Sequence, residues 1–141
     1  MDFKGCATFA SEAKICCLAT NDDGQPRVRA MSVFFADETG IYLQTSREKD
    51  LYRQLKADPR VEMCFWKPTE MAVTMMRVEG RAEFVEDRKL KEKAIAERPY
   101  LRACGLTADS PEIVIFRVAK GRAWFWTMQD NFKPKQKIEF G

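Results

Sequence analysis

The chain of 141 residues contains no histidine. This absence excludes Ser-His and Cys-His catalysis, most catalytic zinc sites and histidine-ligated haem. The five cysteines are odd in number, irregularly spaced and without a Cys-x-x-Cys pair, a pattern typical of reduced, mostly buried thiols. We therefore predict no metal site, and any chemistry has to come from other groups or from a bound cofactor.

Long apolar stretches are also missing. No run approaches the ~20 residues that span a bilayer, and the first residues, MDFKGCATFASEAK, lack the basic and apolar regions of a secretory signal. The net charge of +3 is small and charges of both signs alternate along the chain, which argues against a nucleic-acid-binding surface. We expect a cytoplasmic protein without membrane contacts, in which residues 1–141 form a single domain.

What is present is a series of short extended segments separated by turn signals. We predict strands over residues 15–20, 26–36, 41–45, 60–66 and 71–85, and a closing hairpin over 112–128 around Lys120-Gly121. Helices are predicted over 3–14, around Leu51 and Leu55 up to Pro59, and from Asp87 to Pro99; residues 100–111 and the tail after Gln129 are expected to be irregular.

Two features of this pattern define the fold class. Strands follow one another without intervening helices at two points, which fits a doubly wound parallel sheet poorly. Gly80, in the middle of the longest predicted strand, indicates a bulge of the kind that barrel strands need. We predict a mainly β (β+α) protein, a partly closed antiparallel barrel of six or seven strands with peripheral helices.

Basic and hydroxyl side chains gather where two of the predicted strands end. Arg27 and Arg29 are two residues apart on a strand and so point to the same face. Thr45 and Glu48 fit a capping box, and the helix N-terminus that it predicts, with Lys49 beside it, is a natural phosphate seat. The same residues also fit solvated strand arginines and a plain helix cap, so residue types alone leave both interpretations open.

Three pieces of the sequence together resemble the pyridoxamine 5′-phosphate oxidase-like family of FMN-binding split barrels. They are CLATNDDGQPRVRAM, IYLQTSREKDLYRQLKADPRVEMCFW and VEGRAEFVED. The second is similar to the family's block of a strand, Thr/Ser-Lys, a helix and D-P-x-V, and the third to its V-x-G-x-A strand. The closing stretch IFRVAKGRAWFWTM is similar to the last hairpin of the short members, among them the Nim-type (nitroimidazole-resistance) proteins.

The resemblance implies an antiparallel split β-barrel that binds FMN in a groove at the interface of a homodimer. It implies that Arg29, Thr45, Ser46 and Lys49 meet the phosphate, and that the backbone from Arg29 to Phe34 runs beside the flavin ring. Trp126 is a further candidate for contact with the ring or the substrate, although paired aromatic residues on a strand more often lie in a core or an interface. The candidate cofactor-binding residues are Arg29, Ala30, Met31, Ser32, Val33, Phe34, Gln44, Thr45, Ser46, Lys49, Met75 and Trp126.

The chain also departs from the family. True pyridoxamine phosphate oxidases are longer and end with an Arg-x-His element that clasps the substrate, whereas this chain has no histidine and reaches Gly141 soon after its last hairpin. We therefore do not expect pyridoxamine phosphate oxidation. The missing histidine also disfavours the haem-degrading relatives, and it differs from the Nim-type proteins that carry one near the cofactor.

These observations favour an FMN-dependent oxidoreductase that transfers hydride or electrons between FMN and a small organic substrate. The sequence identifies neither the substrate nor a catalytic residue. A flavin carrier or electron-transfer protein without a dedicated substrate is the alternative, and a cofactor-free interaction module is a third possibility. In each flavin-binding case we expect a homodimer, with Arg29 and Lys49 at the surface of the groove.

Overall fold

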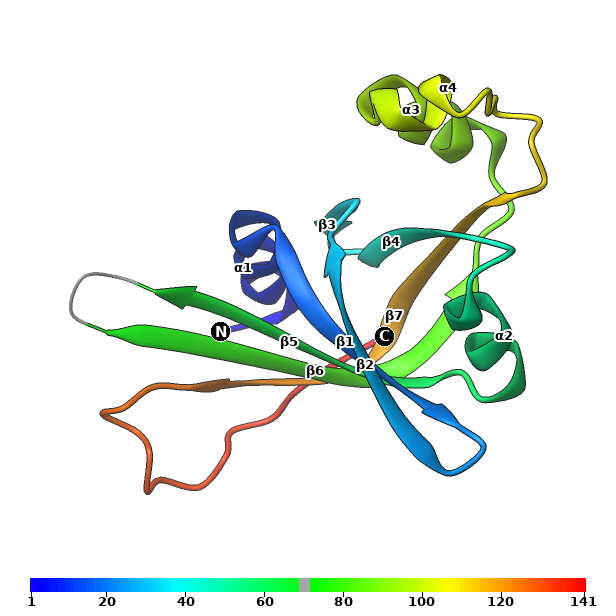
Figure 1. Ribbon diagram of the computed structural model, residues 1–141. Helices are drawn as coiled ribbons and strands as arrows, with labels where there is room; N and C mark the ends of the chain where they lie inside the picture. Colours follow the sequence, from blue (N-terminus) through cyan, green and yellow to red (C-terminus); the bar gives the residue numbers. More distant parts are fainter. Residues whose placement is uncertain (69–71) are drawn as a thin grey trace.

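Eight antiparallel strands form one sheet in the structure, a computed structural model that describes residues 1–68 and 72–141 (Figure 1). The strands are β1 (Ile15–Asp22), β2 (Gln25–Ser32), β3 (Phe35–Asp37), β4 (Gly40–Ser46), β5 (Arg60–Pro68), β6 (Val73–Phe84), β7 (Ile113–Trp126) and β8 (Ile138–Phe140). Their order is β2-β1-β5-β6-β7-β4-β3, with β8 paired to β7. The sheet curls without closing, which confirms the predicted split barrel; the short strands β3 and β8 raise the strand count above that expected.

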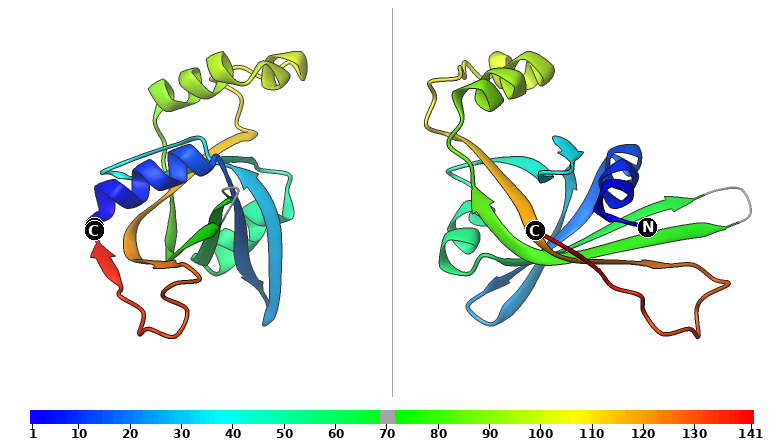
Figure 2. Two further views of the ribbon diagram at one scale, coloured as in Figure 1. Left: turned by 90° about the vertical axis from the view of Figure 1, so that its left-hand side faces the viewer. Right: turned by 180° about the vertical axis from the view of Figure 1, so that it is seen from behind.

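Helices flank this sheet at three places. They are α1 (Phe3–Ala13), α2 (Asp50–Ala57), α3 (Arg88–Glu97) and α4 (Pro99–Ala103). α1 packs beside β1 and β3, and α2 lies against β1 and β4 on another side of the barrel (Figure 1). α3 and α4 stand away from the barrel body in every view (Figure 2).

Buried apolar side chains form two clusters. The larger cluster fills the inside of the curled sheet and includes Leu18, Leu43, Met63, Phe65, Met76, Val78 and Phe116. The smaller cluster joins α3 and α4 to β4 and β7 and consists of Phe34, Tyr42, Ala94, Leu101 and Ile115. Burying each large apolar side chain contributes about 1.5–3 kcal/mol. Because side chains alternate between the faces of a strand, this burial fixes the register of every long strand.

The β1–β2 hairpin determines how the strand with Arg29 is presented. Its turn residues, Asp23 and Gly24, both have positive φ (50° and 88°), as the predicted turn at this place requires. In a two-residue hairpin the pair that flanks the turn is hydrogen-bonded, and bonded and non-bonded pairs then alternate. Arg29 and Leu18 form a bonded pair by this count, so the backbone of the next residue, Ala30, points away from β1 to the open edge.

The predicted capping box at Thr45 and Glu48 is wrong. Thr45 is a buried residue of β4, and α2 begins only at Asp50, with Lys49 as its N-cap and no side-chain cap bond. The Ser46 hydroxyl donates to the Glu48 carboxylate instead. Pairing with β7 continues to the last residue of β4, and this pairing keeps the chain extended where the local sequence favours a helix start.

The predicted closing hairpin around Lys120-Gly121 is also wrong, because β7 is one continuous strand. Gly121 lies opposite Gly80 of β6, where the register shifts, so the bulge predicted at Gly80 is confirmed. A Cβ atom on Gly121 would lie 2.0 Å from the carbonyl oxygen of Glu79. The glycine therefore permits two strands to approach closely and does not make a turn.

Smaller differences concern the ends of elements. The strand predicted over 26–36 stops at Ser32 and pairing resumes in β3. Part of the segment predicted to be irregular forms α4, since Pro99 suits the first turn of a helix, and part of the tail pairs as β8. The predicted first residue of the fifth strand, Met71, lies outside the described residues. All five cysteines are free, but Cys17 and Cys104 are exposed, whereas mostly buried thiols were predicted.

Candidate functional site

Arg29 is the centre of the candidate site. Its Nη1 donates to the Leu18 carbonyl oxygen (3.2 Å) and to Thr20 Oγ1 (2.8 Å), and its Nη2 donates to Gln54 Oε1 (2.6 Å). All three acceptors are neutral, and no carboxylate in the described chain forms an ion pair with this guanidinium. Burial lowers the pKa of Arg29, while the charge of Asp50 acts in the opposite direction. A half-buried cation without an anionic partner is unfavourable, so the position suits an anionic ligand.

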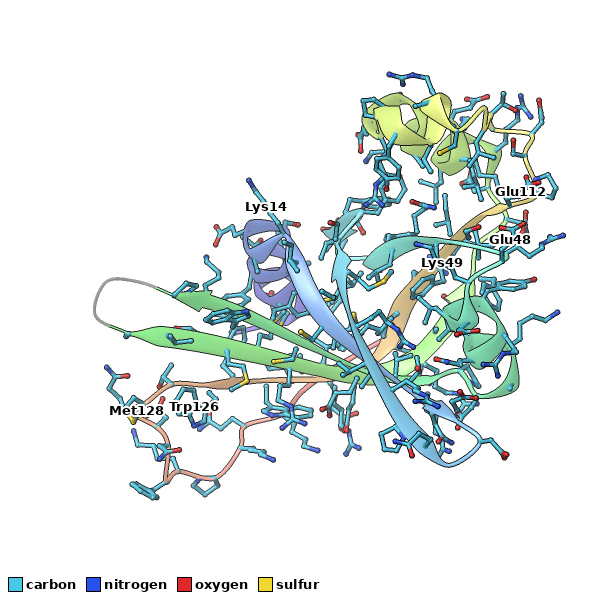
Figure 3. All side chains as sticks on the ribbon, viewed as in Figure 1. Lys14, Glu48, Lys49, Glu112, Trp126 and Met128 are labelled. Atoms are coloured by element: carbon cyan, nitrogen blue, oxygen red, sulfur yellow. The ribbon has the colours of Figure 1, made fainter. Side chains whose placement is uncertain are left out.

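A cavity of about 630 Å³ opens beside Arg29, between β2, the end of β4 and the start of α2. It is lined by Asp22, Arg27, Val28, Arg29, Ala30, Met31, Thr45, Lys49, Asp50, Leu51 and Gln54. Figure 3 shows Lys49 at the start of α2, close to the end of β4. The fold thus brings Arg29, Thr45 and Lys49, predicted as phosphate contacts, to one cavity from three separate elements.

Thr45 is the second residue of the cavity that suits an anionic ligand. Its Oγ1 is buried and lacks a hydrogen-bond partner among the described residues, a condition that costs about 1–3 kcal/mol. Because Thr45 also lines the cavity, its hydroxyl could donate a hydrogen bond to a phosphate oxygen held there. Lys49 adds a cation that forms no ion pair within the described chain, and α2 adds the positive end of its dipole. The residues present therefore fit a phosphate group.

Two carboxylates also line the cavity without cancelling its positive charge. Asp22 binds Arg53 (3.0 Å) and Arg27 (3.4 Å), and the hydrogen bond from Arg53 is the main reason why the pKa of this carboxyl is lowered. Asp50 points outward and lies 3.7 Å from Arg53. Arg27 is thus engaged with a carboxylate, which leaves Arg29 and Lys49 as the cations available to a ligand.

The backbone of β2 forms the rim of the cavity. Ala30 and Met31 line it, and β2 is an edge strand of the sheet. Because hydrogen-bonded and non-bonded pairs alternate along the β1–β2 hairpin, the N–H and C=O groups of Ala30 and Ser32 point to the open edge. The N–H groups of Val33 and Phe34 instead donate to carbonyl oxygens of the chain, at 2.8 and 2.9 Å. The edge therefore exposes polar backbone groups as far as Ser32.

Gln44 and Ser46 do not reach this cavity. Thr45 points inward, so its two neighbours on β4 point to the opposite face. Gln44 Nε2 donates to the Thr45 carbonyl oxygen (2.7 Å), and Gln44 Oε1 accepts from Arg98 Nη1 (3.0 Å). Both predicted contacts therefore lie on the side that faces α3 and α4.

Met75 and Trp126 are likewise separated from the phosphate cavity. They are register partners on β6 and β7 and line a second cavity, of about 550 Å³, together with Trp124. Figure 3 shows Trp126 and Lys49 on opposite sides of the molecule. Within one chain, the residues predicted for the phosphate and these predicted ring contacts do not form a single site.

Exposed apolar side chains share the outward face of the sheet with Met75 and Trp126. Register places Val28 of β2, Ile15 of β1 and Trp66 of β5 on this face. Their exposed fractions are 69%, 55% and 58%. Such a patch on a sheet is typical of a contact surface.

Thr20 and Gln54, the two side chains that hold Arg29, are not among the residues predicted for the site. Gln54 lies on the buried side of α2 with Leu51 and Leu55 and is only 3% exposed. A glutamine on the apolar stripe of an amphipathic helix was the available signal. Thr20 gave no such signal, because threonine is common in strands.

The comparisons with known proteins agree with this architecture. A nimc/nima family protein from Clostridium acetobutylicum has a TM-score of 0.80 and 23% identity, with 97% of this chain and 92% of that chain covered. General Stress Protein 26 from Bacillus anthracis has a TM-score of 0.75 and 20% identity, covering 99% and 100%. HutZ, the heme storage protein from Vibrio cholerae, has a TM-score of 0.62 and 19% identity, covering 84% and 90%. No curated protein gave a significant sequence match.

The strand order and the unclosed sheet define an antiparallel split barrel. The family described as pyridoxamine 5′-phosphate oxidase matches residues 4–127, and the chain belongs to this family. In the described residues no helix is long and apolar enough to cross a membrane. The same residues contain no group of three or more cysteine, aspartate or glutamate side chains that could hold a metal ion.

Proposed function

We propose that this protein binds FMN, with the phosphate held by Arg29, Thr45 and Lys49. One observation carries the proposal: among the described residues, Arg29 is a half-buried cation with only neutral hydrogen-bond partners, and it shares its cavity with the Thr45 hydroxyl, which has no partner there. Both groups gain from a phosphate, since charge-assisted hydrogen bonds contribute roughly 1.5–3 kcal/mol each. The polar edge of β2 at Ala30 and Ser32 suits the hydrogen-bonding side of an isoalloxazine ring.

Bound FMN would supply hydride or electron transfer, and the function that fits best is a flavin-dependent oxidoreductase acting on a small organic substrate. The chain's own part is to bind and orient the cofactor. Ala30 and Ser32 would direct fixed backbone dipoles at the ring, and Arg29 and Lys49 would neutralise the phosphate.

A flavin carrier without a dedicated substrate is the second candidate, and the lining of the cavity favours it as a real alternative. Among the described residues, the carboxylates of this lining are Asp22, whose pKa is lowered, and the outward-pointing Asp50. With its pKa lowered by the hydrogen bond from Arg53, Asp22 is not suited to donate a proton near neutral pH. Reduced protein reoxidised faster by added organic acceptors than by oxygen alone would favour the oxidoreductase.

Histidine-ligated haem is a poor alternative, although HutZ shares the fold. The chain has no histidine. The described lining of the phosphate cavity also contains no cysteine or tyrosine that could serve as an axial ligand.

The proposal includes a homodimer with a flavin site at the subunit interface. In one chain, Met75 and Trp126 lie on the outward face, away from Arg29. A second copy seated on this face would cover Val28, Ile15 and Trp66. It could also carry its own outward-face aromatic residues to the edge of β2. C₂ dimers are the commonest way to bury such a patch.

Comparative titration tests the cofactor proposal. Apo protein is titrated with FMN and with riboflavin, which differ by the phosphate alone. We expect FMN to bind at least about tenfold more tightly. Equal affinity for the two flavins, or binding of neither, would overturn the proposal.

A further inference from the structure

Two neutral side chains, Thr20 and Gln54, hold the guanidinium of Arg29. Gln54 Oε1 accepts hydrogen bonds from both Thr20 Oγ1 (2.6 Å) and Arg29 Nη2 (2.6 Å). Thr20 Oγ1 in turn accepts from Arg29 Nη1 at 2.8 Å. Thr20 and Gln54 are 5% and 3% exposed, so the half-buried Arg29 is held by two buried side chains in a closed polar network.

The distances identify the edge of the guanidinium that is used. Nη1 and Nη2 donate to two oxygens that lie only 2.6 Å apart. Acceptors this close fit the two parallel N–H bonds at the end of the guanidinium. The other Nη1–H is taken by the Leu18 carbonyl oxygen.

This count leaves two of the five N–H groups of Arg29. They are Nε–H and the second Nη2–H, which are parallel and form the side edge of the guanidinium. No hydrogen bond within the described chain uses Nε of Arg29. A parallel N–H pair is the fork that binds two oxygens of a phosphate.

We infer that Thr20 and Gln54 are positioning residues that occupy the end of the Arg29 guanidinium and thereby present its Nε/Nη2 edge to the phosphate in the cavity. The inference rests on the proposed function, because it specifies how the same site recognises its phosphate. It also assigns a reason for glutamine at position 54. A neutral acceptor holds the guanidinium and leaves its charge for the ligand, whereas a carboxylate would neutralise it.

The decisive variant is therefore Gln54→Glu, which keeps size and acceptor geometry but adds a charge. Paired with a carboxylate, Arg29 should lose its attraction for the phosphate. We expect the affinity for FMN to fall at least about tenfold, while the affinity for riboflavin stays within about twofold. The salt dependence of FMN binding should also become weaker, because one fewer free cation contributes. A merely structural role would weaken both flavins together.

Thr20→Val tests the second positioning residue without adding charge. It removes one acceptor from the end edge while keeping the shape, so the preference for FMN over riboflavin should fall by several-fold. Gln129→Glu is the matched control for Gln54→Glu, because Gln129 is exposed in the tail beyond β7. The substitution introduces the same chemical change far from the cavity. Circular dichroism of each variant verifies that it is folded.

The outcomes separate this inference from the proposed function. If wild type prefers FMN but Gln54→Glu and Thr20→Val keep that preference, the positioning role is wrong and the FMN proposal stands. If wild type shows no preference, the FMN proposal fails, and inorganic phosphate at matched ionic strength becomes the probe. Phosphate that raises the Tm of wild type and Gln129→Glu, but not of Gln54→Glu, would still support the positioning role. If phosphate changes the Tm of Gln54→Glu as much as that of the other two proteins, the positioning role is overturned as well.

Discussion

Gly121 of β7 lies directly opposite Gly80 of β6, and neither position has room for a side chain. A Cβ on Gly80 would lie 2.5 Å from the Lys120 carbonyl oxygen, and one on Gly121 would lie 2.0 Å from that of Glu79. The two glycines thus permit the close contact at which the register of the longest strand pair shifts. This bulge bends the sheet into a barrel.

Gly121→Ala should therefore destabilise the protein by about 1–3 kcal/mol or more, since the obstacle is backbone that cannot move alone. Urea denaturation measures the loss. Gly105→Ala is the comparison, because Gly105 has open space around it and a φ of 79°, so that it carries only the backbone cost of about 1 kcal/mol. If Gly121→Ala were no worse than Gly105→Ala, the close approach would not matter for stability.

Lys49→Ala and Arg29→Ala should each weaken FMN binding by roughly one to two orders of magnitude, because each removes a cation from the phosphate. The loss should shrink as salt rises. Isothermal titration of each apo variant at two ionic strengths measures both effects. Lys133→Ala is the control, since Lys133 is in the tail and pairs with Asp130. Wild-type affinity in Lys49→Ala and Arg29→Ala would place the phosphate elsewhere.

The two variants should differ in stability, because Arg29 is half-buried and hydrogen-bonded whereas Lys49 is exposed. Arg29→Ala leaves Thr20 and Gln54 partly unsatisfied in a buried network, at a cost of about 1–3 kcal/mol. Lys49→Ala breaks no ion pair of the described chain and should stay within about 0.5 kcal/mol of wild type. Thermal unfolding of the apo proteins checks this difference.

The proposed dimer predicts that charge on the outward sheet face blocks association. Val28→Glu and Trp66→Glu would each bury a carboxylate in an apolar contact, so both should yield monomers by light scattering at micromolar concentration. Phe132→Glu is the control because Phe132, at 98% exposure, lies in the tail. A monomeric wild type that still binds FMN would contradict the dimer proposal.

Acid should remove a stabilising contribution of Asp58. Hydrogen bonds from Arg60 and Asn21 hold the pKa of this carboxyl well below its usual value of 3.8. A lowered pKa in the folded state stabilises at pH values above the usual pKa, and this contribution is lost as pH falls further. Asp58→Asn should therefore be less stable than wild type at pH 7.

The stability difference between Asp58→Asn and wild type should disappear toward the acid end of a urea titration series. Glu38→Gln serves as the reference, since Glu38 makes no hydrogen bond or ion pair through its side chain within the described chain. A difference that stayed constant down to the lowest pH would rule out the linkage.

The sequence by itself determined the fold class. Alternating burial in β1 and β5, and the turn residues Asp23-Gly24, follow rules that act over a few residues, so they could be predicted locally. The same holds for Gly80 as a bulge and for Arg29 and Lys49 as candidate ligands. Their side-chain types indicate phosphate chemistry without reference to the rest of the chain.

Only the tertiary structure decided how these pieces combine. Thr45 remains in β4 because β7 pairs with it, and Gly121 lies within a strand because β6 passes close beside it. Gln54 is distant in sequence from Arg29 and meets it only when α2 packs on β1. Local propensity contributes only a few tenths of a kcal/mol per residue, so long-range strand pairing and packing outweigh it. These contacts form between segments that are distant in sequence, and no local pattern predicts that such segments lie close together.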